Sequence, residues 1–371
     1  MPFLKYYLNM KQFLKSSITI SAIIMLFAFS CKTNNESNAT TDPSTPTTIY
    51  LVKVSEPSNG SLYSLGENIN LQLKLQDDKV IPDSIIVFAN DKKIGKVIGL
   101  NQSIKTDKLN LGTLVIRATA YKEGLHQTAS VSVKLKSNVV PKKYSYRVVK
   151  SYPHDQDAYT QGLLYKDGFL YEGTGQYGSS TVRKVELETG KVIQSINIER
   201  KHFGEGIALF NDNLYELTWT SEVGFVYDFN TFKQIRSFSY NTQGWGLTNN
   251  DKELIMSDGS NVIRFMEPEN FTETKHIEVF DNKGAVDQLN ELELINGDLY
   301  TNVYQTDLIV IIDPETGMVK GVIDFKGLLK DSDRTNQVDV LNGIAWDETG
   351  KRLFVTGKLW PKLYQVELVA R

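Results

Sequence analysis

Short runs of alternating apolar and polar residues recur along most of the chain. Within residues 49–137 the clearest runs cover 69–75, 84–88, 114–120 and 131–135. A period of two residues is typical of a β-strand with one buried face, and turn-forming sequences at 58–60 and 90–91 separate the runs. Short strands at this spacing predict an immunoglobulin-like β-sandwich over residues 49–137. No catalytic constellation falls within it.

The remaining chain, residues 144–371, carries a repeat that occurs five times. Each repeat has a tight turn followed by a hydrophobic segment, and the aligned leucines are Leu170, Leu214, Leu254, Leu299 and Leu353. A second hairpin follows in most repeats, so each holds four strands. Four strands in a period of about 40–45 residues are the signature of a β-propeller blade. We therefore expect an all-β protein with a five-bladed β-propeller, in which residues 144–150 supply the outer strand that the last repeat lacks.

Residues at the same position of each repeat should form rings around the propeller axis. The first ring contains Gln161, Glu205, Trp245, Asn290 and Asn342. The second contains Gly175, Trp219, Gly259, Tyr304 and Lys358, and the third contains Tyr159, Phe203, Gln243, Gln288 and Val340. Taken singly, such residues are explained by packing or by a hydrated channel. Together, one carboxylate, one ammonium, several amides and several aromatic rings predict a binding or catalytic pocket at one mouth of the channel.

An export signal is predicted at residues 1–31. Basic residues precede an apolar run at 18–29, which is too short for a membrane span of about 20 residues. The only cysteine, Cys31, follows this run where a bacterial lipoprotein carries its lipidated cysteine. Residues 32–48 are rich in Asn, Ser, Thr and Pro and predict a flexible linker. We expect an exported protein, lipid-anchored to a bacterial membrane on its periplasmic or cell-surface side.

Composition excludes several classes of function. The chain has 41 Lys and Arg against 44 Asp and Glu, with a formal net charge of −3, which argues against a basic nucleic-acid binder. A single cysteine excludes a disulfide scaffold, and the four histidines lie too far apart for a typical zinc site. The sequence GTGQYG at 173–178 matches a dinucleotide motif, but the alternating segment after it predicts a strand instead of the required helix.

Several short sequences around the rings occur in a characteristic order. They are AYTQGL (158–163), FGEG (203–206), LTW (217–219), GWGL (244–247), SDG (257–259), LNELE (289–293), LNGIA (341–345) and VTGKLW (355–360). In this order they resemble the glutaminyl-peptide cyclotransferase family of the plant and bacterial type, which has a five-bladed propeller. The resemblance covers the propeller region and leaves the sandwich uncovered. It implies an acyltransferase that converts the N-terminal glutamine of peptides and proteins to pyroglutamate and releases ammonia.

The resemblance also implies roles for individual residues. Glu205 resembles the general acid/base of the family, and its polar substrate contacts are matched by Gln161, Asn290 and Lys358. Its aromatic pocket is matched by Tyr159, Phe203, Trp219 and Trp245. Two positions depart from the family: Tyr159 replaces a phenylalanine, and Tyr304 replaces a tryptophan and so alters one pocket wall. Asn342 either contacts the ligand or caps a strand end.

The chemistry of cyclisation agrees with these roles. The α-amine must lose a proton and the leaving nitrogen must gain one, and a single carboxylate, Glu205, can do both. Burial among aromatic rings should raise its pKa. Lys358, with the amide of Asn290 or Gln161, can stabilise the oxyanion. No metal or cofactor is required, although loop carboxylates such as Asp331 and Asp333 remain available for a structural divalent cation. We expect a monomer that acts on peptide or protein substrates, meets the membrane only through its lipid anchor and binds no nucleic acid.

Two other functions use the same residues. A calcium-dependent lactonase-like hydrolase could bind the metal through Glu205, Asn290 and Asn342. This set contains only one carboxylate, and Lys358 would lie near the metal. The second alternative is a non-catalytic binding propeller displayed on the cell surface, with the sandwich as a spacer. Sensitivity to a chelator and the effect of Glu205→Gln distinguish these alternatives from a cyclase.

Overall fold

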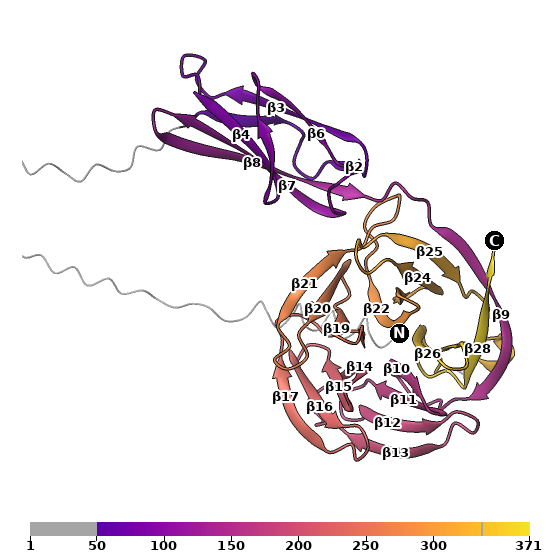
Figure 1. Cartoon of the computed structure of the whole chain (residues 1–371). Coiled ribbons are helices and arrows are strands. Elements are labelled where there is room, and N and C mark those ends of the chain that lie inside the picture. Colours follow the sequence, from indigo (N-terminus) through magenta and orange to yellow (C-terminus); the bar gives the residue numbers. More distant parts are fainter. Residues whose placement is uncertain (1–49, 335–336) are drawn as a thin grey trace, which may run out of the picture. The chain divides into compact units, whose positions relative to one another are not determined.

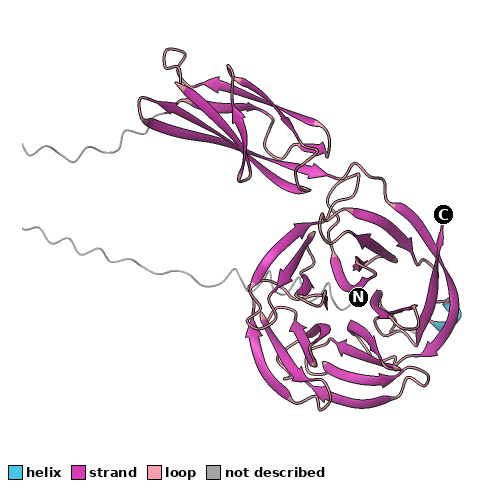
Figure 2. Cartoon of the chain, in the orientation of Figure 1, coloured by secondary structure: helices cyan, strands magenta, loops and turns pink. Residues whose placement is uncertain are grey.

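Almost all regular structure in the protein is β-strand (Figure 2). The computed structural model describes residues 50–334 and 337–371, and the one helical element in them is a 3-10 turn, η1 (Asp331–Asp333). In this described part, no helix is long and apolar enough to cross a membrane. The predicted signal peptide, Cys31 and the linker at 32–48 lie outside the described residues. The prediction of an all-β protein is confirmed.

The N-terminal region consists of two sheets that share one hydrophobic core. Its strands are β1 (Val52–Glu56), β2 (Leu62–Ser64), β3 (Asn68–Leu75), β4 (Ser84–Ala89), β5 (Lys92–Lys96), β6 (Asn101–Lys105), β7 (Gly112–Lys122) and β8 (Leu125–Lys136). One sheet has the order β1-β3-β6 and the other β2-β8-β7-β4-β5. Ile69, Leu71 and Leu73 are buried while the residues between them are exposed, as the two-residue period predicts. The four runs predicted as strands are β3, β4, β7 and β8.

The C-terminal region contains three antiparallel sheets of four strands each. The first has β10 (Thr160–Lys166), β11 (Phe169–Thr174), β12 (Thr181–Glu186) and β13 (Val192–Asn197). The second has β14 (Gly204–Phe210), β15 (Asn213–Thr218), β16 (Val223–Asp228) and β17 (Gln234–Ser239). The third has β18 (Leu247–Asn249), β19 (Leu254–Ser257), β20 (Val262–Met266) and β21 (Glu273–Glu278). In each sheet the strands pair in chain order, as consecutive hairpins require.

An eight-stranded sheet completes the region. It has the order β22-β23-β24-β25-β9-β28-β27-β26. Its strands are β22 (Leu289–Ile295), β23 (Asp298–Val303), β24 (Leu308–Ile312), β25 (Val319–Asp324), β9 (Lys142–Pro153), β26 (Leu341–Asp347), β27 (Arg352–Gly357) and β28 (Lys362–Ala370). The predicted pairing of 144–150 with the last strand is present, because β9 runs antiparallel along β28 (Figure 1). The sequence did not predict a short parallel pairing of β9 with β25.

The sheets of the C-terminal region lie around a common centre, in a propeller-like arrangement (Figure 1). Figure 1 places β10, β14, β22 and β26 near the middle and β13, β17, β21 and β25 on the rim. Neighbouring sheets are joined by shared apolar clusters. In one of them Phe238 stacks on Phe271 of the next sheet, with ring centroids 4.1 Å apart. Burying a side chain of this size stabilises the fold by about 1.5–3 kcal/mol.

Glycines let the innermost strands approach one another at the backbone. A Cβ atom on Gly206 would lie 2.5 Å from the nitrogen of Leu247, and one on Gly246 would lie 2.3 Å from the carbonyl oxygen of Asn290. Neither distance is compatible with a side chain, so these positions require glycine. The backbone N–H of Gly206 donates to the carbonyl of Trp245 at 2.7 Å. This close contact brings residues from separate sheets within reach of one another at the centre.

Candidate active site

The predicted site residues all lie at one end of the central strands. In each sheet they stand at or just before the start of the first strand, or just after the end of the second. At the start lie Tyr159, Gln161, Phe203, Glu205, Trp245, Asn290 and Asn342, and after the second strand lie Trp219, Tyr304 and Lys358. Because the two strands of a hairpin are antiparallel, the start of one is beside the end of the other. The residues that the repeat positions grouped into rings therefore lie together at one mouth of the propeller-like arrangement.

Irregular pairing coincides with the polar ring residues. The register of the first hairpin shifts between Thr160 and Gly162, at Gln161, and similar shifts enclose Glu205, Asn290 and Asn342. A β-bulge turns a side chain away from the regular alternation and often occurs beside active sites. In the third sheet, Trp245 precedes β18 altogether. The four polar side chains are thus oriented by bulges, which the alternation pattern alone does not predict.

Glu205 is a buried carboxylate with one amide partner. Its residue is 4% exposed, and Gln161 Nε2 donates to Glu205 Oε1 at 3.1 Å. Burial raises the pKa of Glu205 well above its ordinary value, and the Lys358 ammonium offsets this only in part. A carboxylate with a raised pKa can hold a proton near neutral pH and also give it up, which is the property a general acid/base needs.

Lys358 is a buried ammonium held between aromatic rings. It is 2% exposed, and its Nζ lies 4.7 Å from the ring centroid of Tyr159 and 5.0 Å from that of Tyr304. Such cation–π contacts partly replace the water that the ammonium loses. Burial lowers the pKa of Lys358 to about 8, although Glu205 and Asp339 act in the opposite direction. Glu205 and Lys358 each favour the ionised form of the other, so the two groups lie within electrostatic range of one another in a desolvated site.

Aromatic rings form two groups around these charges. Tyr159 contacts Phe203 edge-on at 6.1 Å, and Phe203 contacts Trp219 at 5.7 Å. On the other side, Trp245 meets Tyr304 at 5.4 Å with the ring planes nearly perpendicular. Edge-to-face contacts of this kind are a favoured aromatic geometry. The five predicted aromatic residues are therefore brought together in two linked groups that share Lys358.

Of the three predicted amides, Gln161 and Asn342 interact with each other and Asn290 stands apart. Asn342 Nδ2 donates to the carbonyl of Thr160 at 3.0 Å and to Gln161 Oε1 at 3.4 Å. Asn342 is thus a bracing residue behind Gln161. The backbone carbonyl of Asn290 accepts from Ser257 Oγ at 2.7 Å, while its buried side-chain Oδ1 has no partner among the described residues.

Two further residues complete the network around the site. Gln243 Oε1 accepts from the indole nitrogens of both Trp219, at 2.8 Å, and Trp245, at 3.0 Å. Asp339 Oδ2 accepts from the Tyr159 hydroxyl at 3.1 Å. Gln243 belongs to the third ring, so its position in the repeat was a usable signal. Asp339 lies one residue before the ring position, and only the folded structure reveals its contact with Tyr159.

The replacement Gly175→Ala tests how tightly the aromatic group is packed. A Cβ atom on Gly175 would lie 2.2 Å from Cε1 of Phe203 and 3.0 Å from Cγ of Gln161. We expect the Phe203 ring to move, stability to fall by about 1–3 kcal/mol, and KM to rise. Urea unfolding and steady-state kinetics measure the two effects. Gly284→Ala, whose added methyl group meets nothing within 4 Å, is the control, and equal effects of both changes would contradict this interpretation.

No cluster of three or more His, Cys, Asp or Glu residues capable of holding a metal ion is found in residues 50–334 and 337–371. The loop carboxylate Asp333, considered for a structural cation, is paired with Lys362 at 2.8 Å. The residues considered for a lactonase-like calcium site, Glu205, Asn290 and Asn342, include one carboxylate. The Lys358 ammonium already interacts electrostatically with that carboxylate and lowers its pKa. This donor set is a poor match for calcium, which prefers several carboxylate oxygens.

The fold is all-β and propeller-like, and the site combines a buried carboxylate of raised pKa, a buried ammonium and several aromatic rings. Such a combination is typical of enzymes that transfer protons. A sequence model described as glutamine cyclotransferase matches residues 118–368. The chain is 45% identical over 228 residues to a glutaminyl-peptide cyclotransferase of Arabidopsis thaliana, covering 60% of this chain and 70% of that protein. The crystal structure of Myxococcus xanthus glutaminyl cyclase is similar with a TM-score of 0.59 and 35% identity, covering 62% of this chain and 99% of that one. The chain belongs to the glutamine cyclotransferase family.

Proposed function

We propose that the protein is a glutaminyl-peptide cyclotransferase, an acyltransferase that cyclises N-terminal glutamine. The α-amine nitrogen attacks the γ-carbonyl carbon, a new C–N bond closes the five-membered ring, and the bond to the side-chain nitrogen breaks to release ammonia. The observation that carries the proposal is the buried carboxylate of Glu205, which accepts a hydrogen bond from Gln161 and interacts electrostatically with the ammonium of Lys358. Membership of the family supports the same substrate class.

Glu205 acts as the proton shuttle in this proposal. Its ionised form accepts a proton from the attacking α-amine, and the resulting acid delivers that proton to the departing nitrogen. One group can perform both steps because the donor and acceptor nitrogens are attached to the same carbon in the tetrahedral intermediate. Support comes from the raised pKa of Glu205, which reduces the cost of holding the proton between the two transfers.

Lys358 stabilises the oxyanion that forms on the γ-carbonyl oxygen. An ammonium in a desolvated site interacts strongly with a developing negative charge. The side-chain amide of Asn290 is a second donor for this oxygen, and the unpartnered Oδ1 of Asn290 is available to accept from the substrate. Tyr159, Phe203, Trp219, Trp245 and Tyr304 surround the glutamine side chain and favour its folded, attacking conformation. Gln161 orients Glu205, and Asn342 braces Gln161.

The proposal also includes the domain boundaries, the lipid anchor and the location of the protein. We assign residues 144–371 to a five-bladed β-propeller, supported by five groups of four strands in the described residues, and 49–137 to an immunoglobulin-like sandwich. Residues 1–31 are assigned to a lipoprotein-type signal peptide with lipid on Cys31, and 32–48 to a linker. The protein then acts as a monomer, without a metal in catalysis, at the periplasmic or outer side of a bacterial membrane.

Ammonia release from a short peptide with N-terminal glutamine tests the function. We expect one ammonia per peptide and a mass loss equal to ammonia, unaffected by a chelator. The same peptide with an acetylated α-amine is the matched control, because its nitrogen cannot attack and it should release nothing. Chelator-sensitive release would overturn metal independence and favour a metal-dependent hydrolase. Binding without any release, with every glutamine peptide tried, would favour a non-catalytic propeller.

A further inference from the structure

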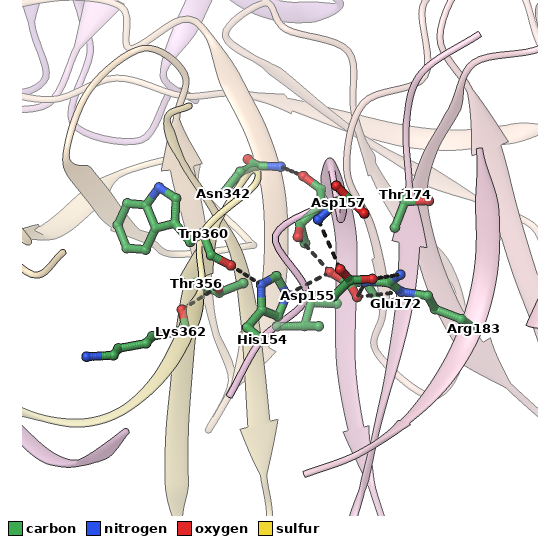
Figure 3. Close-up of polar contacts among 12 residues, drawn as sticks. His154, Asp155, Asp157, Glu172, Thr174, Arg183, Asn342, Thr356, Trp360 and Lys362 are labelled. Atoms are coloured by element: carbon green, nitrogen blue, oxygen red, sulfur yellow. Dashed lines mark hydrogen bonds and ion pairs between the residues drawn. The ribbon is translucent and has the colours of Figure 1, made fainter. Parts of the chain in front are cut away.

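A buried cluster of charges lies beside the candidate active site and takes no part in the steps above. Figure 3 shows His154 between Trp360 and Glu172, with Arg183 on the far side of the carboxylate. His154 is 9% exposed, Glu172 1% and Arg183 7%. Glu172 Oε1 is 3.0 Å from His154 Nε2, and Glu172 Oε2 accepts from Arg183 Nε and Nη2 at 2.9 and 2.7 Å. Asp155 Oδ2 accepts from Arg183 Nη1 at 2.8 Å.

The contacts of His154 determine its charge. Its Nδ1 lies 2.7 Å from the carbonyl oxygen of Trp360, and its Nε2 faces the Glu172 carboxylate. A carbonyl and a carboxylate can only accept hydrogen bonds, so both ring nitrogens must donate, and an imidazole with two N–H groups is a cation. Burial works against this charge, but the Glu172 carboxylate and the two hydrogen bonds outweigh it and raise the pKa of His154; Arg183 opposes them.

The cluster is electrically balanced within itself. Its cations are His154 and Arg183, and its anions are Glu172 and Asp155. Although burial disfavours the ionised form, the charges of Arg183 and His154 hold the pKa of Glu172 below its ordinary value. Removing the proton of His154 would leave the Trp360 carbonyl without its donor or turn an imidazole lone pair toward the Glu172 carboxylate, and either loss is costly at a buried site.

The cluster is joined to the turn that carries Lys358. The carbonyl of Trp360, two residues after Lys358, accepts from His154 Nδ1, and the carbonyl of Pro361 accepts from the backbone N–H of His154 at 3.0 Å. Leu359 donates to the carbonyl of Ala158 at 2.7 Å and has a φ of 60°, which is unfavourable for a residue with a side chain. The turn therefore depends on outside hydrogen bonds for its shape.

The same cluster reaches the other side of the site. Thr160 Oγ1 donates to Glu172 Oε1 at 2.6 Å, and Thr160 stands between Tyr159 and Gln161. Glu172 thus links the strand that bears Gln161 to the histidine that holds the Lys358 turn. Lys358 and Gln161 come from opposite ends of the propeller region, and this cluster is a direct polar connection between their segments.

We propose that protonated His154 is a positioning residue, which fixes the Lys358 ammonium relative to Glu205 through its side-chain hydrogen bond to the carbonyl of Trp360. The inference rests on the proposed cyclase function. His154 touches no substrate in this scheme; it acts through Lys358. When the imidazolium loses its proton, the hydrogen bond to Trp360 or to Glu172 is lost and the turn relaxes.

A double-mutant cycle with His154→Gln and Lys358→Met tests the inference. We expect His154→Gln to lower kcat by about 10- to 100-fold with a smaller effect on KM. If His154 acts through Lys358, the same change in the Lys358→Met background should cost less than about threefold, because coupled residues are non-additive. Equal losses in both backgrounds would overturn the proposal. The matched control is His276→Gln, which removes an exposed histidine paired with Glu273 at 2.7 Å and should leave kcat unchanged.

Nuclear magnetic resonance gives two readouts that need no turnover. In the wild-type protein, ring nitrogen shifts should report His154 as still doubly protonated above its ordinary pKa of about 6.5, and a ring that loses its proton at or below that pH would overturn the proposal. In His154→Gln, the Lys358 side chain should titrate at a higher pH than in the wild type, because the relaxed turn exposes its ammonium. An unchanged titration would also overturn it. A wild-type protein that is inactive on every glutamine peptide would instead contradict the proposed function.

Discussion

Glu205→Gln is expected to lower kcat by about 10²- to 10⁴-fold, the usual contribution of a general acid/base. The amide keeps the size of the side chain and can still contact Gln161, but it cannot take up the proton of the α-amine. In the proposed function the substrate is held mainly by aromatic rings, so KM should change little. Steady-state kinetics with a glutamine peptide measure both constants. A kcat within about threefold of the wild type would contradict the role of Glu205 as proton shuttle.

Although Glu205→Gln should lower kcat, it should not lower the stability of the folded protein at high pH. The pKa of Glu205 is raised in the folded state, so its contribution to stability is present below the unfolded-state pKa and is lost as pH rises through the folded-state pKa. Glutamine has no proton to lose, so the variant should be at least as stable as the wild type in alkaline buffer. Glu216→Gln is the matched control, since burial raises the pKa of Glu216 to about 8. It should show the same stability trend with unchanged kcat.

Lys358→Met is expected to lower kcat by about 10²- to 10³-fold, as does the loss of one oxyanion donor in other enzymes. The pH profile should change as well. In the wild type, kcat should fall as Lys358 loses its proton near its pKa of about 8, and this limb should disappear in the variant. The Lys358 charge also lowers the pKa of Glu205, so the acidic limb should move to higher pH. The two limbs belong to the coupled pair, so both should be measured together.

A suitable control for this variant is another lysine that stacks on aromatic rings. Lys184 Nζ lies 4.1 Å from the ring centroid of Phe169 and 5.7 Å from that of Tyr171. Neither aromatic residue occupies one of the repeat positions that form the rings of site residues. Lys184→Met should leave kcat and the pH profile unchanged. A profile of Lys358→Met that keeps its alkaline limb near pH 8 would show that another group, such as the substrate amine, produces that limb.

The repeat pattern predicted which residues gather at one end of the central strands, for a physical reason. Hairpins of equal length bring equivalent positions to the same end of each sheet, so the position of Glu205 relative to Leu214 also locates Asn290 relative to Leu299. Asn342 is found in the same way once the two extra residues in the turn before Leu353 are counted. Lys358 lies at the predicted end of its hairpin even though the turn of its repeat is two residues longer, because its position was counted from the leucine that follows the turn.

Other features depend on contacts between distant segments, which one sequence does not display. The bulges at Gln161 and Glu205 arise where neighbouring backbones meet through glycine, and the alternation pattern contains no sign of them. His154 looked isolated because its partners, Glu172 and Trp360, are 18 and 206 residues away. Asp339 and Tyr159 are likewise 180 residues apart and meet only because the first and last sheets of the propeller region are neighbours. Residues that support the site are therefore harder to predict than those that line it.

The pairing of β9 with β28 also dictates the order in which the protein can fold. β9 is synthesised before all the other strands of the propeller region, yet β28, its long antiparallel partner, is the last of them, so the main-chain groups of β9 that face β28 stay unpaired until β28 is made. Such an edge invites unwanted association, and contacts between remote segments form slowly. Lys358 precedes β28 by only a few residues. The Lys358 ammonium should therefore reach its place only once β28 has paired with β9, and chains that stop short of β28 should be inactive.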